Sequence, residues 1–220
     1  MLKYCGRKLF SLANRLEYRK CHPRVFSYND CFETIRILNS FIKAEYLLDI
    51  GANAGNWTYV LHQVNPLLKH AVMFEPQKKY YDKLRTVDLP GVEKIVYPYG
   101  LGDHEDQAVI QGGTASASIL NATDVQDYYF PGSLNEETEE IEIRVLDKIY
   151  AEDYLPYPDV IKLDVQGFEL NVLKGARQVL SKAKYLVIEL SYEEFYSGQP
   201  KLGEIIRFLE ENNYSMVAHG

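Results

Sequence analysis

The sequence is poor in the features that define several protein classes. It has three cysteines in 220 residues, at positions 5, 21 and 31, with neither CxxC spacing nor neighbouring ligand residues. This pattern favours reduced thiols in a cytoplasmic protein over disulfides or a metal centre. No apolar run approaches the roughly 18 residues that a membrane-spanning helix requires. The apolar stretch 9–13 is also too short for the core of a signal peptide.

Basic residues are outnumbered by acidic ones, 24 to 31, which gives a formal net charge of −7. The first 24 residues differ, because they hold seven Lys or Arg and one acidic residue, a net charge of +6 that leaves −13 on the remainder. An acidic body is unsuited to extended contact with phosphates, so no nucleic-acid partner is expected. For the basic arm 1–24, contact with its own acidic domain or simple exposure to solvent is the preferred interpretation, and contact with an anionic membrane surface is the alternative.

What the sequence does contain is typical of one globular enzyme domain. Hydrophobic residues make up 46% and charged residues 25% of the chain, and 220 residues suffice to bury a substantial core. We expect a basic arm and leading helix over 1–44 and a single domain over 45–220. The sequence leaves the oligomeric state open.

Strands and helices alternate along this domain. Apolar runs predict strands at 45–50, 71–75, 94–97, 159–164 and 185–190, and helical spacing predicts helices at 57–62, 77–88, 169–181 and 202–210. Strands joined by helices indicate an α/β fold with a mostly parallel, doubly wound sheet. Residues 106–147 interrupt the alternation with β-like runs at 107–110 and 140–145, which predict an antiparallel insertion.

The most informative stretch is 47–57, where an apolar strand leads into a glycine-spaced turn and a helix. Gly51 and Gly55 can adopt positive φ and have no Cβ, so the backbone can turn sharply and a cofactor can approach it. Twenty-six residues after Asp49, a second apolar strand ends in Glu75. A carboxylate there is placed to accept hydrogen bonds from both ribose hydroxyls of an adenosine. Together these features predict a nucleotide pocket.

The same turn discriminates between cofactors. A dinucleotide site uses Gly-x-Gly-x-x-Gly, whose glycines admit a pyrophosphate, whereas here Asn53 stands where the middle glycine would be. The amino acid tail of S-adenosyl-L-methionine instead needs acceptors for its ammonium and donors for its carboxylate. Asp49, Asn53 and the loop carbonyls can supply these, so the turn favours S-adenosyl-L-methionine.

A second group of candidate residues surrounds the strand at 159–164. Lys162 lies inside an otherwise apolar strand, and because side chains two residues apart share a face, Asp164 is its expected carboxylate neighbour. Asp164 also ends its strand at the edge where open α/β sheets bind ligands. Glu189 ends the next strand at the same edge. We predict catalytic roles for Asp164, Glu189 and Lys162; a structural ion pair between Lys162 and Asp164 is the alternative.

Several segments resemble the FkbM family of S-adenosylmethionine-dependent methyltransferases, in order and spacing from about residue 46 to 215. They are 48–55, 74–76, 101–103, 145–147, 161–170 and 172–176. The resemblance implies a Rossmann-like class I methyltransferase fold and methyl transfer to a hydroxyl, often on a sugar or natural product. The implied partner is a small-molecule or glycan acceptor.

The resemblance also assigns roles to residues. The methionine end of the cofactor would lie against the turn and the helix that follows it, at Asp49, Gly51, Asn53, Gly55 and Asn56. Glu75 would hold the ribose. After the third strand, Gly102 and Asp103 would lie near the adenine.

Two departures from the family pattern stand out. Gln166 replaces the glutamate of the usual Lys-Ile-Asp-Val-Glu-Gly, which removes a charge beside the predicted active site. Members of the family also continue into a last pair of strands that completes the sheet, whereas only residues 214–218 correspond to that pair here. Three hypotheses follow: an O-methyltransferase with Asp164 as the base, an NAD(P)-dependent oxidoreductase or epimerase, and a noncatalytic cofactor-binding protein of this fold.

Overall fold

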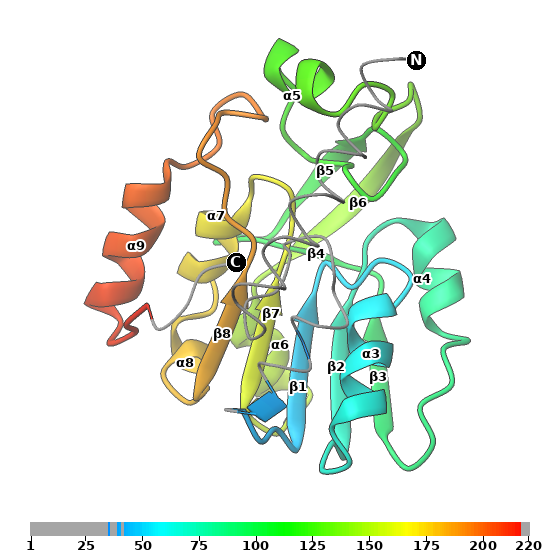
Figure 1. Cartoon of the computed structure of the whole chain (residues 1–220), viewed down its shortest axis with the longest axis vertical. Helices are drawn as coiled ribbons and strands as arrows, with labels where there is room; N and C mark the ends of the chain where they lie inside the picture. Colours follow the sequence, from blue (N-terminus) through cyan, green and yellow to red (C-terminus); the bar gives the residue numbers. More distant parts are fainter. Residues whose placement is uncertain (1–34, 36–38, 41, 217–220) are drawn as a thin grey trace, which may run out of the picture.

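The computed structural model describes Ile35, residues 39–40 and residues 42–216 (Figure 1). The basic arm 1–24, the three cysteines and most of the predicted leading helix lie outside the described residues. The prediction that the arm forms a unit separate from the domain therefore remains a prediction.

Five strands form a parallel sheet. They are β1 (Tyr46–Ile50), β2 (His70–Phe74), β3 (Glu93–Tyr97), β7 (Val160–Leu163) and β8 (Tyr185–Ile188). Their order is β3-β2-β1-β7-β8, and every neighbouring pair is parallel. From β1, the chain builds one side of the sheet through β2 and β3, and later the other side through β7 and β8. The carboxyl ends of β1 and β7 therefore adjoin at the switch point, where open α/β sheets bind ligands.

Helices cover both faces of this sheet, because neighbouring residues of each strand point to opposite faces. On one face, Leu48 and Ile50 of β1 pack in the cluster that includes residues of α6 (Leu146–Glu152), α7 (Glu169–Lys174), α8 (Arg177–Leu180) and α9 (Leu202–Glu211). On the other face, Leu47 packs with residues of α3 (Asn56–Val64), and Met73 of β2 packs with Leu84 of α4 (Lys78–Leu84). Figure 1 shows α3 in front of the sheet and α6 behind it. This is the doubly wound arrangement predicted from the sequence.

A second, smaller sheet occupies the predicted insertion. It contains β4 (Gly100–Leu101), β6 (Thr138–Arg144) and β5 (Asp106–Gln111), in the order β4-β6-β5. β5 is antiparallel to β6, and β4 is parallel to it. The antiparallel pair was predicted, whereas β4 and α5 (Asp124–Tyr129) were not. Figure 1 shows β5, β6 and α5 beyond the carboxyl ends of the main strands, so the insertion lies over the ligand edge.

The predicted helix 169–181 is two helices. α7 ends at Lys174 and α8 begins at Arg177. The break follows from a close approach at Gly175, where an added Cβ would lie 2.0 Å from the carbonyl oxygen of Gly102. The interruption therefore brings the chain after β4 against the end of α7.

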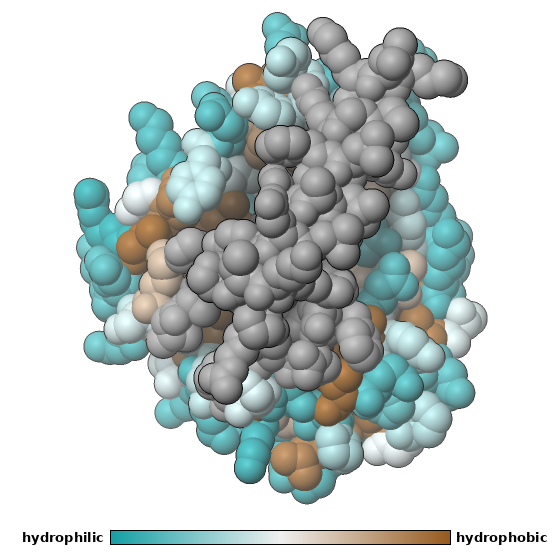
Figure 2. Space-filling view, viewed as in Figure 1, coloured by the Kyte–Doolittle hydropathy of each residue, from teal (hydrophilic) through white to brown (hydrophobic). Residues whose placement is uncertain are grey.

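The surface shown in Figure 2 is mostly hydrophilic where residues are described, with hydrophobic residues in small separate groups. Within the described part of the chain, we find no helix that has both the length and the apolar character needed to cross a membrane.

Candidate active site

The turn after β1 has the backbone conformation that its residues predict. Gly51, Asn53 and Gly55 have φ angles of 73°, 50° and 81°, values that glycine adopts freely and asparagine tolerates better than most residues. The amide groups of Gly51 and Ala52 donate hydrogen bonds to the carbonyl oxygen of Phe74 at the end of β2. The turn is thus fixed to the second strand, and α3 begins directly after it at Asn56.

The two glycines also serve packing inside the protein. A Cβ on Gly51 would lie 1.8 Å from the carbonyl oxygen of Asp164, at the end of β7. A Cβ on Gly55 would lie 2.8 Å from Leu84 of α4. At both positions, the space that a side chain would need is filled by the protein itself, so glycine lets β7 and α4 approach the turn.

A first cavity of about 110 Å³ opens at the carboxyl ends of β1, β2 and β7. Its polar lining includes residues that the sequence singled out, Gly51, Asn53, Glu75, Asp164 and Gln166, and also Gln77, which the sequence did not single out. Its apolar lining includes residues of the small sheet and its connections, among them Leu101, Ile110 and Ile141. The first cavity therefore combines a polar edge from the main sheet with an apolar wall from the insertion.

Glu75 is almost fully buried at the edge of the first cavity, with 3% of its surface exposed. Its carboxylate accepts hydrogen bonds from the backbone amides of Asn53, at 2.8 Å, and Gln77, at 2.9 Å. Burial penalises the charged form, and these two bonds offset the penalty only in part, so the pKa of Glu75 rises to about 7. The carboxylate keeps further lone pairs for a ligand that donates hydrogen bonds.

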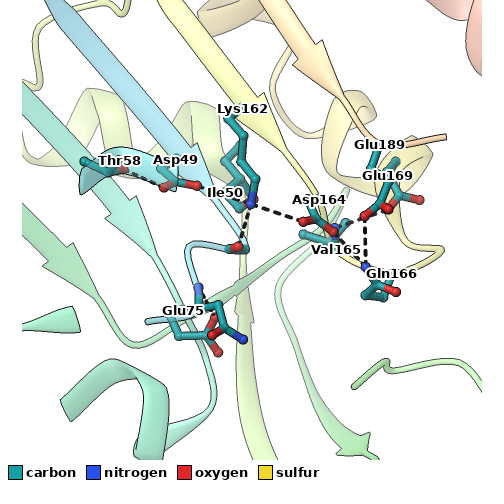
Figure 3. Close-up of polar contacts among 12 residues, drawn as sticks. Asp49, Ile50, Thr58, Glu75, Lys162, Asp164, Val165, Gln166, Glu169 and Glu189 are labelled. Atoms are coloured by element: carbon teal, nitrogen blue, oxygen red, sulfur yellow. Dashed lines mark hydrogen bonds and ion pairs between the residues drawn. The ribbon is translucent and has the colours of Figure 1, made fainter. Parts of the chain in front are cut away.

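Lys162 lies beneath the turn, in a buried network with two carboxylates (Figure 3). Its Nζ lies 3.4 Å from Oδ1 of Asp49 and 3.4 Å from Oδ2 of Asp164, and it donates a 2.7 Å hydrogen bond to the carbonyl oxygen of Gly51. Burial acts to lower the pKa of Lys162, but the two carboxylates outweigh it and raise that pKa above its ordinary value. Lys162 thus joins the end of β1, the turn and the end of β7.

Asp49 has no exposed surface. One oxygen accepts a 2.6 Å hydrogen bond from the hydroxyl of Thr58 on α3, and the other faces Lys162. Neither Asp49 nor Lys162 lines the first cavity. Of the predicted ion pair Lys162–Asp164, only Asp164 lines the first cavity. Lys162 is instead buried beside Asp49 and supports the turn.

Gln166 links the two carboxylates at the ends of β7 and β8. Its side-chain amide donates hydrogen bonds to Oδ1 of Asp164, at 2.8 Å, and to Oε2 of Glu189, at 3.1 Å (Figure 3). Burial acts to raise the pKa of Asp164, but the Lys162 ammonium and the hydrogen bonds with Glu189 and Gln166 hold it below its ordinary value. Asp164 is therefore ionised at neutral pH.

A second cavity, of about 260 Å³, lies on the other side of Gln166. Glu169, Glu189 and Tyr196 line it, together with Gln126 and the aromatic residues Phe130 and Phe195. The Tyr196 hydroxyl lies 2.9 Å from Oε1 of Gln166 and 2.6 Å from the carbonyl oxygen of Ser116. Gln166 lines both cavities, so the two meet at this residue.

The remaining predicted residues lie outside both linings. Asn56 is exposed at the start of α3, and Gly55 precedes it as the helix cap. The amide of Gly102 donates to the carbonyl oxygen of Arg144, and the carboxylate of Asp103 accepts a hydrogen bond from His104. Gly100 and Leu101, immediately before them, line the first cavity instead.

Sequence reasoning missed several lining residues. Tyr99 and Phe168 line the first cavity, and Phe195 and Tyr196 line the second. Their positions next to recognised motifs were the available signal for Tyr99 and Phe168. Phe195 and Tyr196 lie in the connection between β8 and α9, where no motif marked them.

The chain is similar to known methyltransferases. The family model described as "Methyltransferase FkbM domain" matches residues 49–216. The chain is 27% identical over 185 residues to 2-O-methyltransferase NoeI of Sinorhizobium fredii, covering 78% of this chain and 73% of that protein. It is 24% identical over 148 residues to hexuronic acid methyltransferase AglP of Haloferax volcanii, covering 66% of this chain and 56% of that protein.

A solved structure shares the fold. The crystal structure of methyltransferase FkbM from Methylobacillus flagellatus superposes with a TM-score of 0.51 at 17% identity, and the match covers 90% of this chain. The chain spans about half, 52%, of that structure's length. The Rossmann-like methyltransferase fold predicted from the sequence is thereby confirmed. Since the family model covers more than half of its residues, the chain belongs to the FkbM family of methyltransferases.

Proposed function

We propose that the protein is an S-adenosyl-L-methionine-dependent O-methyltransferase that acts on a hydroxyl of a sugar or glycan. The observation that carries the proposal is the meeting of two cavities at Gln166, with Asp164 lining the first and Glu189 lining the second. Methyl transfer needs a cofactor and an acceptor held side by side with water excluded, and two adjoining cavities suit that requirement.

The first cavity fits the cofactor by the chemistry of its donors and acceptors. When bound, S-adenosyl-L-methionine supplies an electrophilic methyl group carried on a sulfonium. Glu75 would accept hydrogen bonds from the ribose hydroxyls, and the apolar wall around Leu101 and Ile141 suits the adenine. Because Asp49 is enclosed by Thr58 and Lys162, Asn53 and the carbonyl oxygens of the turn are the acceptors for the methionine ammonium. Asp49 and Lys162 then act as supports for the turn.

Asp164 and Glu189 supply the proton acceptor for the hydroxyl. Gln166 donates a hydrogen bond to each carboxylate, which holds them next to each other at the junction of the cavities. Lys162 keeps Asp164 ionised, so a basic oxygen is present without a preceding proton loss. Asp164 is the preferred base, and Glu189, which lines the acceptor side, can share the proton.

The names of the relatives support a hydroxyl acceptor on a carbohydrate. One is named as a 2-O-methyltransferase, and the other as a methyltransferase of hexuronic acid. The oxidoreductase alternative is less well supported, because the pattern around Asn53 lacks the middle glycine of a dinucleotide site.

Calorimetry on the purified full chain tests the cofactor. S-adenosyl-L-methionine and S-adenosylhomocysteine should bind, whereas NAD and NADP should not. Glu75→Ala should weaken cofactor binding. The control Glu136→Ala, at an exposed position, should leave cofactor binding unchanged. Tighter binding of a nicotinamide dinucleotide would support the oxidoreductase. Cofactor binding without turnover on any hydroxylated acceptor would support a noncatalytic protein.

A further inference from the structure

We propose that the second cavity is an acceptor subsite for an uncharged sugar ring and that it rejects acceptors carrying a carboxylate, such as uronic acids. The inference rests on the methyltransferase function proposed above and adds the class of acceptor. It comes from three observations on the second cavity: its position, its aromatic wall and the sign of its charges.

The second cavity lies beside the first because the two share Gln166. Gln166 lines both cavities, and its side chain contacts Asp164 on one side and both Glu189 and Tyr196 on the other. A ring in the second cavity would present a hydroxyl to the carboxylates at the junction. The connection between β8 and α9 and the insertion form the aromatic wall, and the loop between β7 and α7 supplies Gln166, Gly167 and Glu169.

The aromatic wall suits the C–H faces of a sugar. The rings of Phe130 and Phe195 lie 5.5 Å apart with 67° between their planes, and both line the second cavity. Phe130 is 51% exposed, so its ring is accessible. Tyr129 packs edge-on against Phe195 at 6.1 Å and holds this ring in place. Aromatic faces of this kind provide contact area without requiring charge.

The charges in the second cavity are negative. Glu169 and Glu189 line it, Asp164 lies just beyond Gln166, and none of the described lining residues is a lysine, arginine or histidine. The other polar lining residues include Ser191, Gln126 and Gln199, which are neutral. A carboxylate on the acceptor would be desolvated beside like charges without the cation that usually recognises it. An uncharged ring can donate its hydroxyls to the same oxygens.

Glu169 is fixed in this wall. Its carboxylate accepts hydrogen bonds from the amides of Val165, at 3.2 Å, and Gly167, at 3.1 Å, and it is 6% exposed. These bonds anchor the loop between β7 and α7, so the carboxylate cannot swing away to admit an anion. The fold therefore fixes the position of this acidic group, while burial raises the pKa of Glu169 above its ordinary value.

The test uses matched pairs of phenyl glycosides, each a neutral hexoside and the corresponding uronide. Saturation-transfer NMR on the full chain with S-adenosylhomocysteine should show binding of neutral members and about tenfold weaker or no binding of uronides. With radiolabelled S-adenosyl-L-methionine, label should enter neutral members only. Binding or labelling of uronides equal to their neutral partners overturns the inference and leaves the methyltransferase proposal standing. A panel that neither binds nor is labelled, with a protein that binds the cofactor, also overturns it.

Three variants sharpen the result. Phe195→Ala should weaken hexoside binding several-fold with unchanged S-adenosylhomocysteine affinity. Ser191→Arg, which adds a cation to the lining, should raise the ratio of uronide to hexoside binding. Ser181→Arg, directly after α8, exposed and outside the lining, should leave that ratio unchanged. An unchanged ratio in the folded Ser191→Arg variant would contradict the charge argument. Failure of cofactor binding in the unmodified chain would instead contradict the proposed function.

Discussion

The two cavities that meet at Gln166 differ in how much the main sheet contributes to their linings. The first has its polar edge at the ends of β1, β2 and β7, where hydrogen bonds join the turns that follow neighbouring strands, and its apolar wall in the insertion. The second takes its aromatic wall from the insertion and from the connection between β8 and α9, and the loop between β7 and α7 adds Gln166 and Glu169. The difference teaches that the polar edge of the first cavity is held by the sheet, while the aromatic wall of the second cavity is held by connections outside the sheet.

The largest expected effect is on turnover, at the junction. Asp164→Asn keeps the size of the side chain and removes the negative charge, so turnover should fall about 10²- to 10⁴-fold, the usual contribution of a positioned base. Affinity for S-adenosylhomocysteine, measured by calorimetry, should change much less. Normal turnover in this variant would assign the proton to Glu189 or to solvent.

Lys162→Met should destabilise the fold by about 3–5 kcal/mol, because it leaves the buried carboxylate of Asp49 without its cation. Urea unfolding measures this loss. The matched control is Lys184→Met, which breaks an ion pair with Asp159 in which the lysine side chain is 66% exposed. The control should cost no more than about 1 kcal/mol. Equal losses in the two variants would contradict the supporting role of Lys162.

Glu75→Ala should weaken cofactor binding by about 1–3 kcal/mol, the usual scale for hydrogen bonds to a charged group. Acceptor binding in the second cavity should be unaffected, which separates the two cavities experimentally. An unchanged cofactor affinity in a folded variant would show that Glu75 does not hold the ribose.

Cofactor affinity should also depend on pH. Because the pKa of Glu75 is about 7 in the free protein, and ribose hydroxyls donate to the ionised form, affinity should rise about tenfold between roughly pH 6 and pH 8. Glu75→Gln should flatten this dependence.

The folding stability of the free protein should depend on pH in the opposite direction. The stability contributed by protonated Glu75 is present at acid pH and is lost as pH rises through about 7. Glu75→Gln should therefore gain most in relative stability at alkaline pH, and a gain largest at acid pH would contradict the assignment.

How much the sequence could predict differs between the cavities for a physical reason. The parallel sheet, the turn at Gly51 and the carboxylate of Glu75 follow from local signals: apolar runs, positive φ and the position of an acid at a strand end. The pairing of Lys162 with Asp164 also followed from strand periodicity. The burial of Asp49 did not, because it depends on Thr58 from the following helix.

The second cavity could not be predicted because its residues are brought together only by tertiary structure. Phe130 and Phe195 are 65 positions apart, and the loop that carries Phe195 is joined to Asn121 and Thr123 by backbone hydrogen bonds. No spacing rule connects such segments. The role of Gln166 was equally hidden, since the loss of a glutamate was visible but the two carboxylates it bridges were not.

The most direct test of the two-cavity account is a crystal structure of the full chain with S-adenosylhomocysteine and a hexoside. The account predicts the adenosine in the first cavity with its ribose hydroxyls bonded to Glu75, and the sugar in the second cavity with a hydroxyl facing Asp164 or Glu189. An adenosine bound in the second cavity, or a ribose that makes no contact with Glu75, would contradict it.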